Sequence, residues 1–201
     1  MGGPVIAAIG AAMASSLGVW DLAPGEVVER LADQTLEAWI WGNVLLGIGV
    51  AVTTGGLAAL AASIGGAVAR SGGALAVMAG AIAAVGFLVQ GVGNAEAADL
   101  LNRTGEIPGG FLVVSAIQES LLILFGGLAA LGTLGIGVGS LQAAWLTRGL
   151  GVTVVILALI ALALLVLNIP FLALLGALVF GIGLLTPHRR TTTEAYGIGS
   201  R

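Results

Sequence analysis

Five long tracts of this sequence consist almost entirely of apolar residues. They cover residues 4–20, 43–64, 73–91, 111–140 and 151–186. A transmembrane helix needs about 20 such residues in a row to cross a hydrocarbon core about 30 Å thick. Only 8% of the residues are charged, whereas soluble domains carry about 25% because their surface faces water. We therefore expect an integral membrane protein with an all-α fold.

The last tract is too long for one crossing. Pro170, near its middle, cannot donate a helical hydrogen bond, and it disfavours helical backbone at Ile169. A tight turn there divides the tract into crossings at 151–167 and 170–186. The alternative, a single kinked helix, would overshoot the bilayer. The sequence thus predicts a polytopic bundle of six membrane helices.

The first tract, residues 4–20, has a second interpretation as a signal peptide. Ala12, Met13 and Ala14 resemble a small-residue cleavage site. No Lys or Arg precedes the tract, however, so the basic segment typical of a signal peptide is missing. We expect the tract to remain as a membrane helix; cleavage would leave five helices.

The charged residues sort by side of the membrane. One set of loops, together with the C-terminal segment, contains Arg70, Arg148, Arg189, Arg190 and Arg201 with one acid, Glu194. The other set contains eight acids with Arg30 and Arg103. Because basic residues favour the cytoplasmic side, both termini are expected in the cytoplasm. Residues 1–201 then form one domain in the cell (inner) membrane, with a cytoplasmic tail at 187–201.

Tryptophans lie at the predicted boundaries of the membrane. Trp20, Trp39 and Trp41 fall at the outer boundary, and Trp145 falls beside the inner one. Tryptophan is enriched at both membrane interfaces. We therefore interpret these residues as an aromatic belt.

Two exterior segments are predicted to be helical. Residues 24–40 form an amphipathic pattern with Pro24 in the first turn. This helix is acidic, which argues against binding to anionic lipid. It is either a docking face or cap over a cavity, or a solvated linker. Residues 94–103 predict a short helix with Asn94 as N-cap and an ion pair between Asp99 and Arg103.

Glu119 is the only ionisable residue inside a predicted span. Ser115 lies one turn before it on the same helix face, and Gln118 is adjacent. A charge inside a membrane is costly and by default marks a functional site. These three residues are therefore candidates to bind a proton, a cation or a substrate amine in a cavity. Alternatively, the embedded helix begins at Ser120, and Glu119 lies at the outer interface.

Glycine is abundant, with 34 residues, most of them in or beside the predicted helices. Small residues allow helix backbones to approach closely, and Gly135 and Gly139 have the four-residue spacing typical of such contacts. We predict helix packing within the chain or with a membrane partner or second copy. The candidate packing residues are Gly55, Gly56, Gly126, Gly127, Gly132, Gly135 and Gly139.

Several chemistries are excluded by composition. The chain has no lysine, so no side chain can form a Schiff base or serve as the lysine of a phosphate-binding loop. It has no cysteine, so it lacks a thiol nucleophile. Its one histidine, His188, has no companions for a metal site. We expect no catalytic residues, metal, cofactor or nucleic-acid partner. The sequence favours a non-catalytic accessory or interaction subunit with an acidic exterior face; the alternative is a small-solute or ion transporter component using Glu119.

The order of these elements resembles a family of bacterial six-helix membrane proteins catalogued as a domain of unknown function. The shared features are a short first helix, an exterior helix before the second crossing, and a Trp-Leu-x-Arg-Gly-Leu-Gly link. In this chain that link covers residues 145–151. The resemblance implies a six-helix bundle in a bacterial inner membrane and brings no catalytic residues with it.

Overall fold

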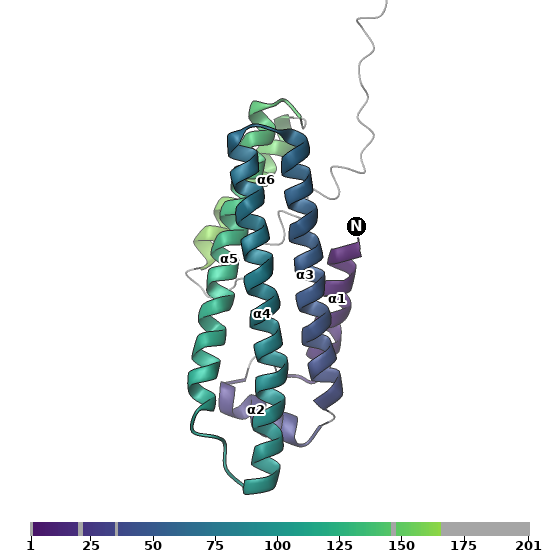
Figure 1. The fold of residues 1–201 in the computed structure, drawn as a ribbon, viewed down its shortest axis with the longest axis vertical. Helices are drawn as coiled ribbons and strands as arrows, with labels where there is room; N and C mark the ends of the chain where they lie inside the picture. The colour runs from purple at the N-terminus through teal and green to yellow at the C-terminus, as the bar shows by residue number, and fades with distance from the viewer. Residues whose placement is uncertain (1, 20–21, 35, 146–147, 166–201) are drawn as a thin grey trace, which may run out of the picture.

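The computed structural model describes residues 2–19, 22–34, 36–145 and 148–165. These residues form an elongated all-α bundle, which confirms the fold class (Figure 1). Three long helices, α3, α4 and α5, run along the bundle, α4 antiparallel to both α3 and α5, with α1 beside α3 and α6 beside α5 (Figure 1). The bounds are α1 Gly2–Ser15, α2 Pro24–Ala32, α3 Leu36–Ile64, α4 Ala67–Thr104, α5 Phe111–Gln142 and α6 Arg148–Leu165.

Four of these helices, α3 to α6, are long and apolar enough to cross a membrane. The first predicted crossing, 4–20, corresponds to α1, which has 14 residues and reaches about 21 Å at the α-helical rise. The helix ends because Ser16 Oγ bonds back to the carbonyl of Met13 and Gly18 takes a φ of +64°. The predicted crossing at 170–186 and the tail at 187–201 lie outside the described residues. Six membrane helices are therefore not confirmed.

The exterior segment 24–40 is not one helix. The chain forms α2 at Pro24–Ala32, leaves helical geometry at Asp33, and starts α3 at Leu36. The break is needed because α2 lies across the end of the bundle whereas α3 runs along it (Figure 1). The predicted amphipathic pattern of α2 is confirmed. Its buried residues, Val27, Val28 and Leu31, pack on Trp39, Ala97, Ala98 and Phe111, while Glu26, Glu29 and Arg30 are exposed.

The second exterior helix is the last part of α4. This helix continues without a break through residues 94–103, so Asn94 is an interior residue and not an N-cap. With 38 residues, α4 is about 57 Å long and must extend beyond a hydrocarbon core of about 30 Å. Gly105 then ends it with a left-handed φ of +75°. The predicted pair of Asp99 and Arg103 is confirmed, at 2.5 Å.

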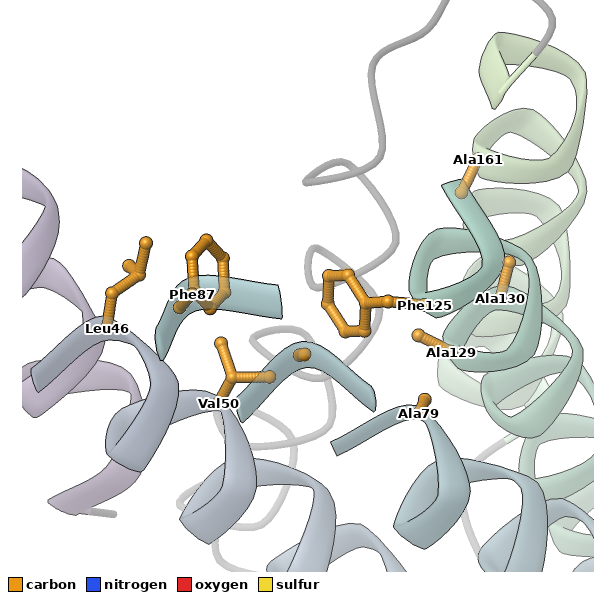
Figure 2. Packing of buried hydrophobic residues seen from close by; sticks show 9 residues of the cluster. Leu46, Val50, Ala79, Phe87, Phe125, Ala129, Ala130 and Ala161 are labelled. Atoms are coloured by element: carbon orange, nitrogen blue, oxygen red, sulfur yellow. The ribbon is translucent and has the colours of Figure 1, made fainter. Parts of the chain in front are cut away.

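The described core is built largely from small side chains. One cluster brings together Leu46 and Val50 of α3, Ala79, Ala83 and Phe87 of α4, Phe125, Ala129 and Ala130 of α5, and Ala161 of α6 (Figure 2). Figure 2 shows Leu46 and Val50 near the ring of Phe87, and the ring of Phe125 directed from α5 toward the same interior. The alanines let the helix backbones approach, and the two rings fill the space that remains.

Helices α1 and α3 pack closely through an antiparallel row of small residues. A Cβ built on Gly10 would lie 2.5 Å from the backbone nitrogen of Leu46 and 2.6 Å from the carbonyl oxygen of Gly42. No side chain fits in that space, so glycine is required at the contact. The pairs that face each other are Gly3 with Thr53, Ala7 with Gly49, Gly10 with Leu46, and Ala14 with Gly42.

Helices α4 and α5 make a similar contact near the opposite end of the bundle. A Cβ on Gly72 would lie 2.6 Å from the carbonyl oxygen of Gly132 and 2.7 Å from the nitrogen of Ile136. Gly135 and Gly139 belong to the same row on α5. The structure therefore places three of the candidate packing glycines against α4.

The other four candidate packing glycines have different surroundings. Gly126 is buried in α5. The only contact for a Cβ on Gly127 would be Leu165 of α6, at 4.0 Å. Gly55 and Gly56 are exposed, and no described atom lies within 4 Å of a Cβ built there. These two glycines therefore make no packing contact among the described residues, because they lie on a face of α3 that no described helix covers.

Candidate functional site

A cavity of about 300 Å³ lies where α2 meets the N-terminal parts of α3 and α5 and the C-terminal part of α4. We call this end of the bundle the acidic end. The three polar candidates from the sequence, Ser115, Gln118 and Glu119, all line the cavity. The described residues that line it are Val19, Leu22, Pro24, Val27, Trp39, Gln90, Asn94, Ser115, Gln118, Glu119 and Leu122.

The first wall of the cavity comes from α5. Ser115, Gln118, Glu119 and Leu122 follow one another at helical spacing, so they share one face of that helix. Ser115 and Gln118 are partly buried, whereas Glu119 is exposed. Glu119 therefore lies where the cavity meets the outside of the bundle.

The opposite wall contains polar residues that were not among the site candidates from the sequence. Gln90 and Asn94 lie one turn apart on α4 and are 9% and 7% exposed. Both line the cavity. A possible signal was their spacing of four residues at the end of a predicted apolar span, which puts two amides on one helix face.

Trp39 forms the wall on α3. It is 1% exposed, and its indole N–H donates to the backbone carbonyl of Gln90 at 3.3 Å. Trp39 is therefore inside the protein and is not part of an aromatic belt. Its neighbour Trp41 is 59% exposed and faces outward, as a belt residue would.

Two buried amide oxygens near this wall accept no hydrogen bond from any residue that the structure describes. They are Oε1 of Gln90 and Oδ1 of Asn43. The amide nitrogen of Asn43 donates to the carbonyl of Trp39 at 2.9 Å, which fixes that side chain. Leaving a buried acceptor unpaired costs about 1–3 kcal/mol.

The acidic end carries strong negative charge. Eight carboxylates and two guanidinium groups among its described residues give a net charge of −6. They are Glu26, Glu29, Asp33, Glu37, Glu96, Asp99, Glu106 and Glu119, with Arg30 and Arg103. The described charged residues of the opposite end are Arg70 and Arg148. No described lining residue of the cavity is basic.

An aromatic layer, formed by Phe87 and Phe125, lies between the cavity lining and the middle of the bundle. Phe87 precedes Gln90 by three residues on α4, and Phe125 follows Leu122 by three on α5. Because the two helices are antiparallel, both rings lie about 4.5 Å deeper than the cavity lining. Both are fully buried. The two rings belong to the hydrophobic core cluster shown in Figure 2.

The chemistry available at this site is that of hydrogen bonding and charge. Within the part of the chain that the structure describes, no group of three or more His, Cys, Asp or Glu side chains is placed to hold a metal ion. The lining offers amides, one hydroxyl, one carboxylate and apolar surface. Such a site can bind and orient a small molecule.

Comparison with models of protein families, with curated proteins and with solved structures gave no match.

Proposed function

We propose that this protein binds a small solute in the cavity at its acidic end, as a component of a membrane transport system. The observation that carries the proposal is the cavity itself. In an otherwise apolar bundle it gathers Ser115, Gln118 and Glu119 of α5 with Gln90 and Asn94 of α4. Concave sites with a few convergent polar groups are typical of ligand binding.

The distribution of charge supports an orientation for the site. Arg70 and Arg148 lie at the end opposite to the cavity, and basic residues favour the cytoplasmic side. In this orientation the acidic end, with α2 and the cavity, faces outward from the cell (inner) membrane. A solute then reaches the site from outside the cell membrane.

An accessory role without transport is the second proposal. It is supported by Gly55 and Gly56, which present small residues on an uncovered face of α3 where a partner helix can pack. In contrast, Gly132, Gly135 and Gly139 pack against α4 of the same chain. The accessory role also leaves the polar lining of the cavity without a purpose, so we place it second.

Cysteine labelling tests the proposal, because the chain has no cysteine of its own. We expect Ser115→Cys, in reconstituted vesicles, to react with a membrane-impermeant thiol reagent added on either side, since a transport site opens to both. Exposed Thr104→Cys at the acidic end and exposed Ser71→Cys at the other end should each react from one side only. Labelling rates, read by mass spectrometry, give the result.

Two outcomes argue against transport. Labelling of Ser115→Cys from the acidic side alone would leave a binding site and favour the accessory role. No labelling from either side, with both control cysteines reactive, would show that the cavity is closed to solutes and would overturn the proposed function.

A further inference from the structure

We infer that the acidic end carries a docking groove for a basic amphipathic segment of a partner protein. The groove, of about 270 Å³, lies between the C-terminal part of α4 and the start of α5. It shares no lining residue with the cavity described above, so the inference does not depend on the transport role. Its lining includes Gly93, Glu96, Ala97 and Leu100 of α4 with Phe111 and Val114 of α5.

The groove presents apolar surface to the outside of the bundle. Its base is formed where the two helices approach, since a Cβ built on Gly93 would lie 3.5 Å from Cγ1 of Val114. Ala97 and Phe111 are buried, whereas Val114 remains 38% exposed and Leu100 is partly exposed. Apolar side chains of another molecule can therefore pack against Val114 and Leu100.

The length of α4 places the groove outside the hydrocarbon core. Arg70 is exposed near the start of this helix, and a charge there marks one boundary of the core. A core about 30 Å thick takes up about 20 residues of helix, so it ends near Gln90. The groove residues from Gly93 to Leu100 lie beyond that point, where α4 continues toward its end (Figure 1).

Trp41 marks the same boundary independently. Its side chain is exposed on the outside of α3, as expected at a membrane interface. A Cβ built on Gly91 would lie 3.0 Å from Cβ of Asn43, so Trp41 lies close to the level of Gly91 along the bundle. Both markers therefore put the groove on the water side of the interface.

Charge around the groove selects the kind of partner. Glu96 lines it, Glu106 lies two residues before the lining residue Pro108, and no described lining residue is basic. Arg103 is paired with Asp99 and does not line the groove. Exposed apolar surface outside the membrane is typical of protein interaction sites, and a negative rim attracts a positive partner. The complement is a segment with apolar residues on one face and Lys or Arg beside them.

Two other occupants fit less well. Lipid acyl chains lie within the hydrocarbon core, whereas the groove lies beyond it, and the acidic rim repels anionic headgroups. A second copy in the same orientation would bring its own acidic end, with a net charge of −6 among the described residues, against this one. The two copies would repel each other.

Peptide binding to the full chain in phosphatidylcholine nanodiscs tests the inference. The probe is a labelled helical peptide of about five turns, with leucine on one face and lysine on the other. The matched probes replace lysine with glutamate, or scramble the order so that no apolar face forms. We expect the first peptide to bind at least about tenfold more tightly than the other two, measured by fluorescence anisotropy with empty discs as the blank.

Variants locate the binding. Val114→Asn should weaken binding of the lysine peptide about tenfold, because it puts an amide into the groove. Leu112→Asn is the control, since Leu112 is exposed on the same helix but does not line the groove, and it should have little effect. Circular dichroism should show similar unfolding temperatures for the two variants.

The charged rim has its own pair of variants. Glu96→Gln should weaken binding about two- to fivefold, as removal of an exposed charge pair does. Glu29→Gln makes the same change on α2, outside the groove, and should matter less.

Fluorescence quenching tests the position of the groove. A fluorophore on Val114→Cys should be quenched by aqueous iodide, and one on Val85→Cys, exposed in the apolar part of α4, by spin-labelled lipid. Quenching of the Val114 label mainly by lipid would assign the groove to the bilayer and overturn the inference.

Three further results would overturn it. They are no binding of the lysine peptide above empty discs, equal effects of Val114→Asn and Leu112→Asn, and a dimer in sedimentation that Val114→Asn dissociates. The last result would assign the groove to a second copy. None of them bears on the cavity, whose role the labelling of Ser115→Cys decides separately.

Discussion

Replacing Phe125 with alanine is expected to lower the free energy of unfolding by about 2–3 kcal/mol, at the lower end of the range for such substitutions in soluble cores. Phe125 is fully buried between α3, α4 and α5, and its loss leaves a space that the surrounding alanines cannot fill (Figure 2). The effect is smaller than in a soluble core because the side chain of an unfolded membrane helix still contacts lipid. Unfolding in nanodiscs followed by circular dichroism measures it.

Leu124→Ala is the matched control, since Leu124 directly precedes Phe125 and is 49% exposed on the outside of α5. It should change stability by much less. Equal losses in the two variants would mean that the aromatic layer is not packed as described.

Gly72→Ala is expected to destabilise the bundle by about 1–3 kcal/mol, the usual cost of overpacking. The added Cβ would meet backbone atoms of Gly132 and Ile136 at 2.6 and 2.7 Å, so α4 and α5 must move apart. Gly56→Ala is the control. It meets no described atom within 4 Å, and alanine is better than glycine in a helix by about 1 kcal/mol. The two substitutions should therefore shift the unfolding temperature in opposite directions.

The test is demanding because the two variants are expected to shift the unfolding temperature in opposite directions. If Gly72→Ala raised the unfolding temperature as Gly56→Ala should, the close contact between α4 and α5 would not exist in the bilayer. If both variants lost stability, the exposed face of α3 would have to be covered, as the accessory role requires.

Hydropathy predicted the positions of α3, α4 and α5, because a bilayer demands long apolar helices with satisfied backbones. It did not predict where they end. Helix α4 continues without a break through Asn94 to Thr104, and α3 begins at Leu36, since a helix need not stop where its apolar tract stops. Hydropathy marks the membrane boundary, whereas caps and tertiary packing decide the last turns.

The candidate site was likewise predictable only where it depends on local sequence and not on tertiary packing. Ser115, Gln118 and Glu119 were predictable because they share one face of one helix, a local property. Gln90 and Trp39 were missed because their role depends on which helices meet. Trp39 and Trp41 also look alike in sequence, yet one is buried and the other exposed, since they lie on different faces of α3.

The contact between α1 and α3 restricts how a solute can be admitted. Because Gly10 and Gly49 leave room for hydrogen only, the two helices move as one body. The element that must move to admit a solute is then α2. This helix of nine residues is held to α4 by apolar contacts and by the hydrogen bond from Asn102 to the carbonyl of Ala32, at 3.0 Å. Helix α2 presents charge outward and lies across the end of the bundle. Its movement leaves the lipid-facing helices in place, so admission of a solute should be insensitive to bilayer thickness and lateral tension.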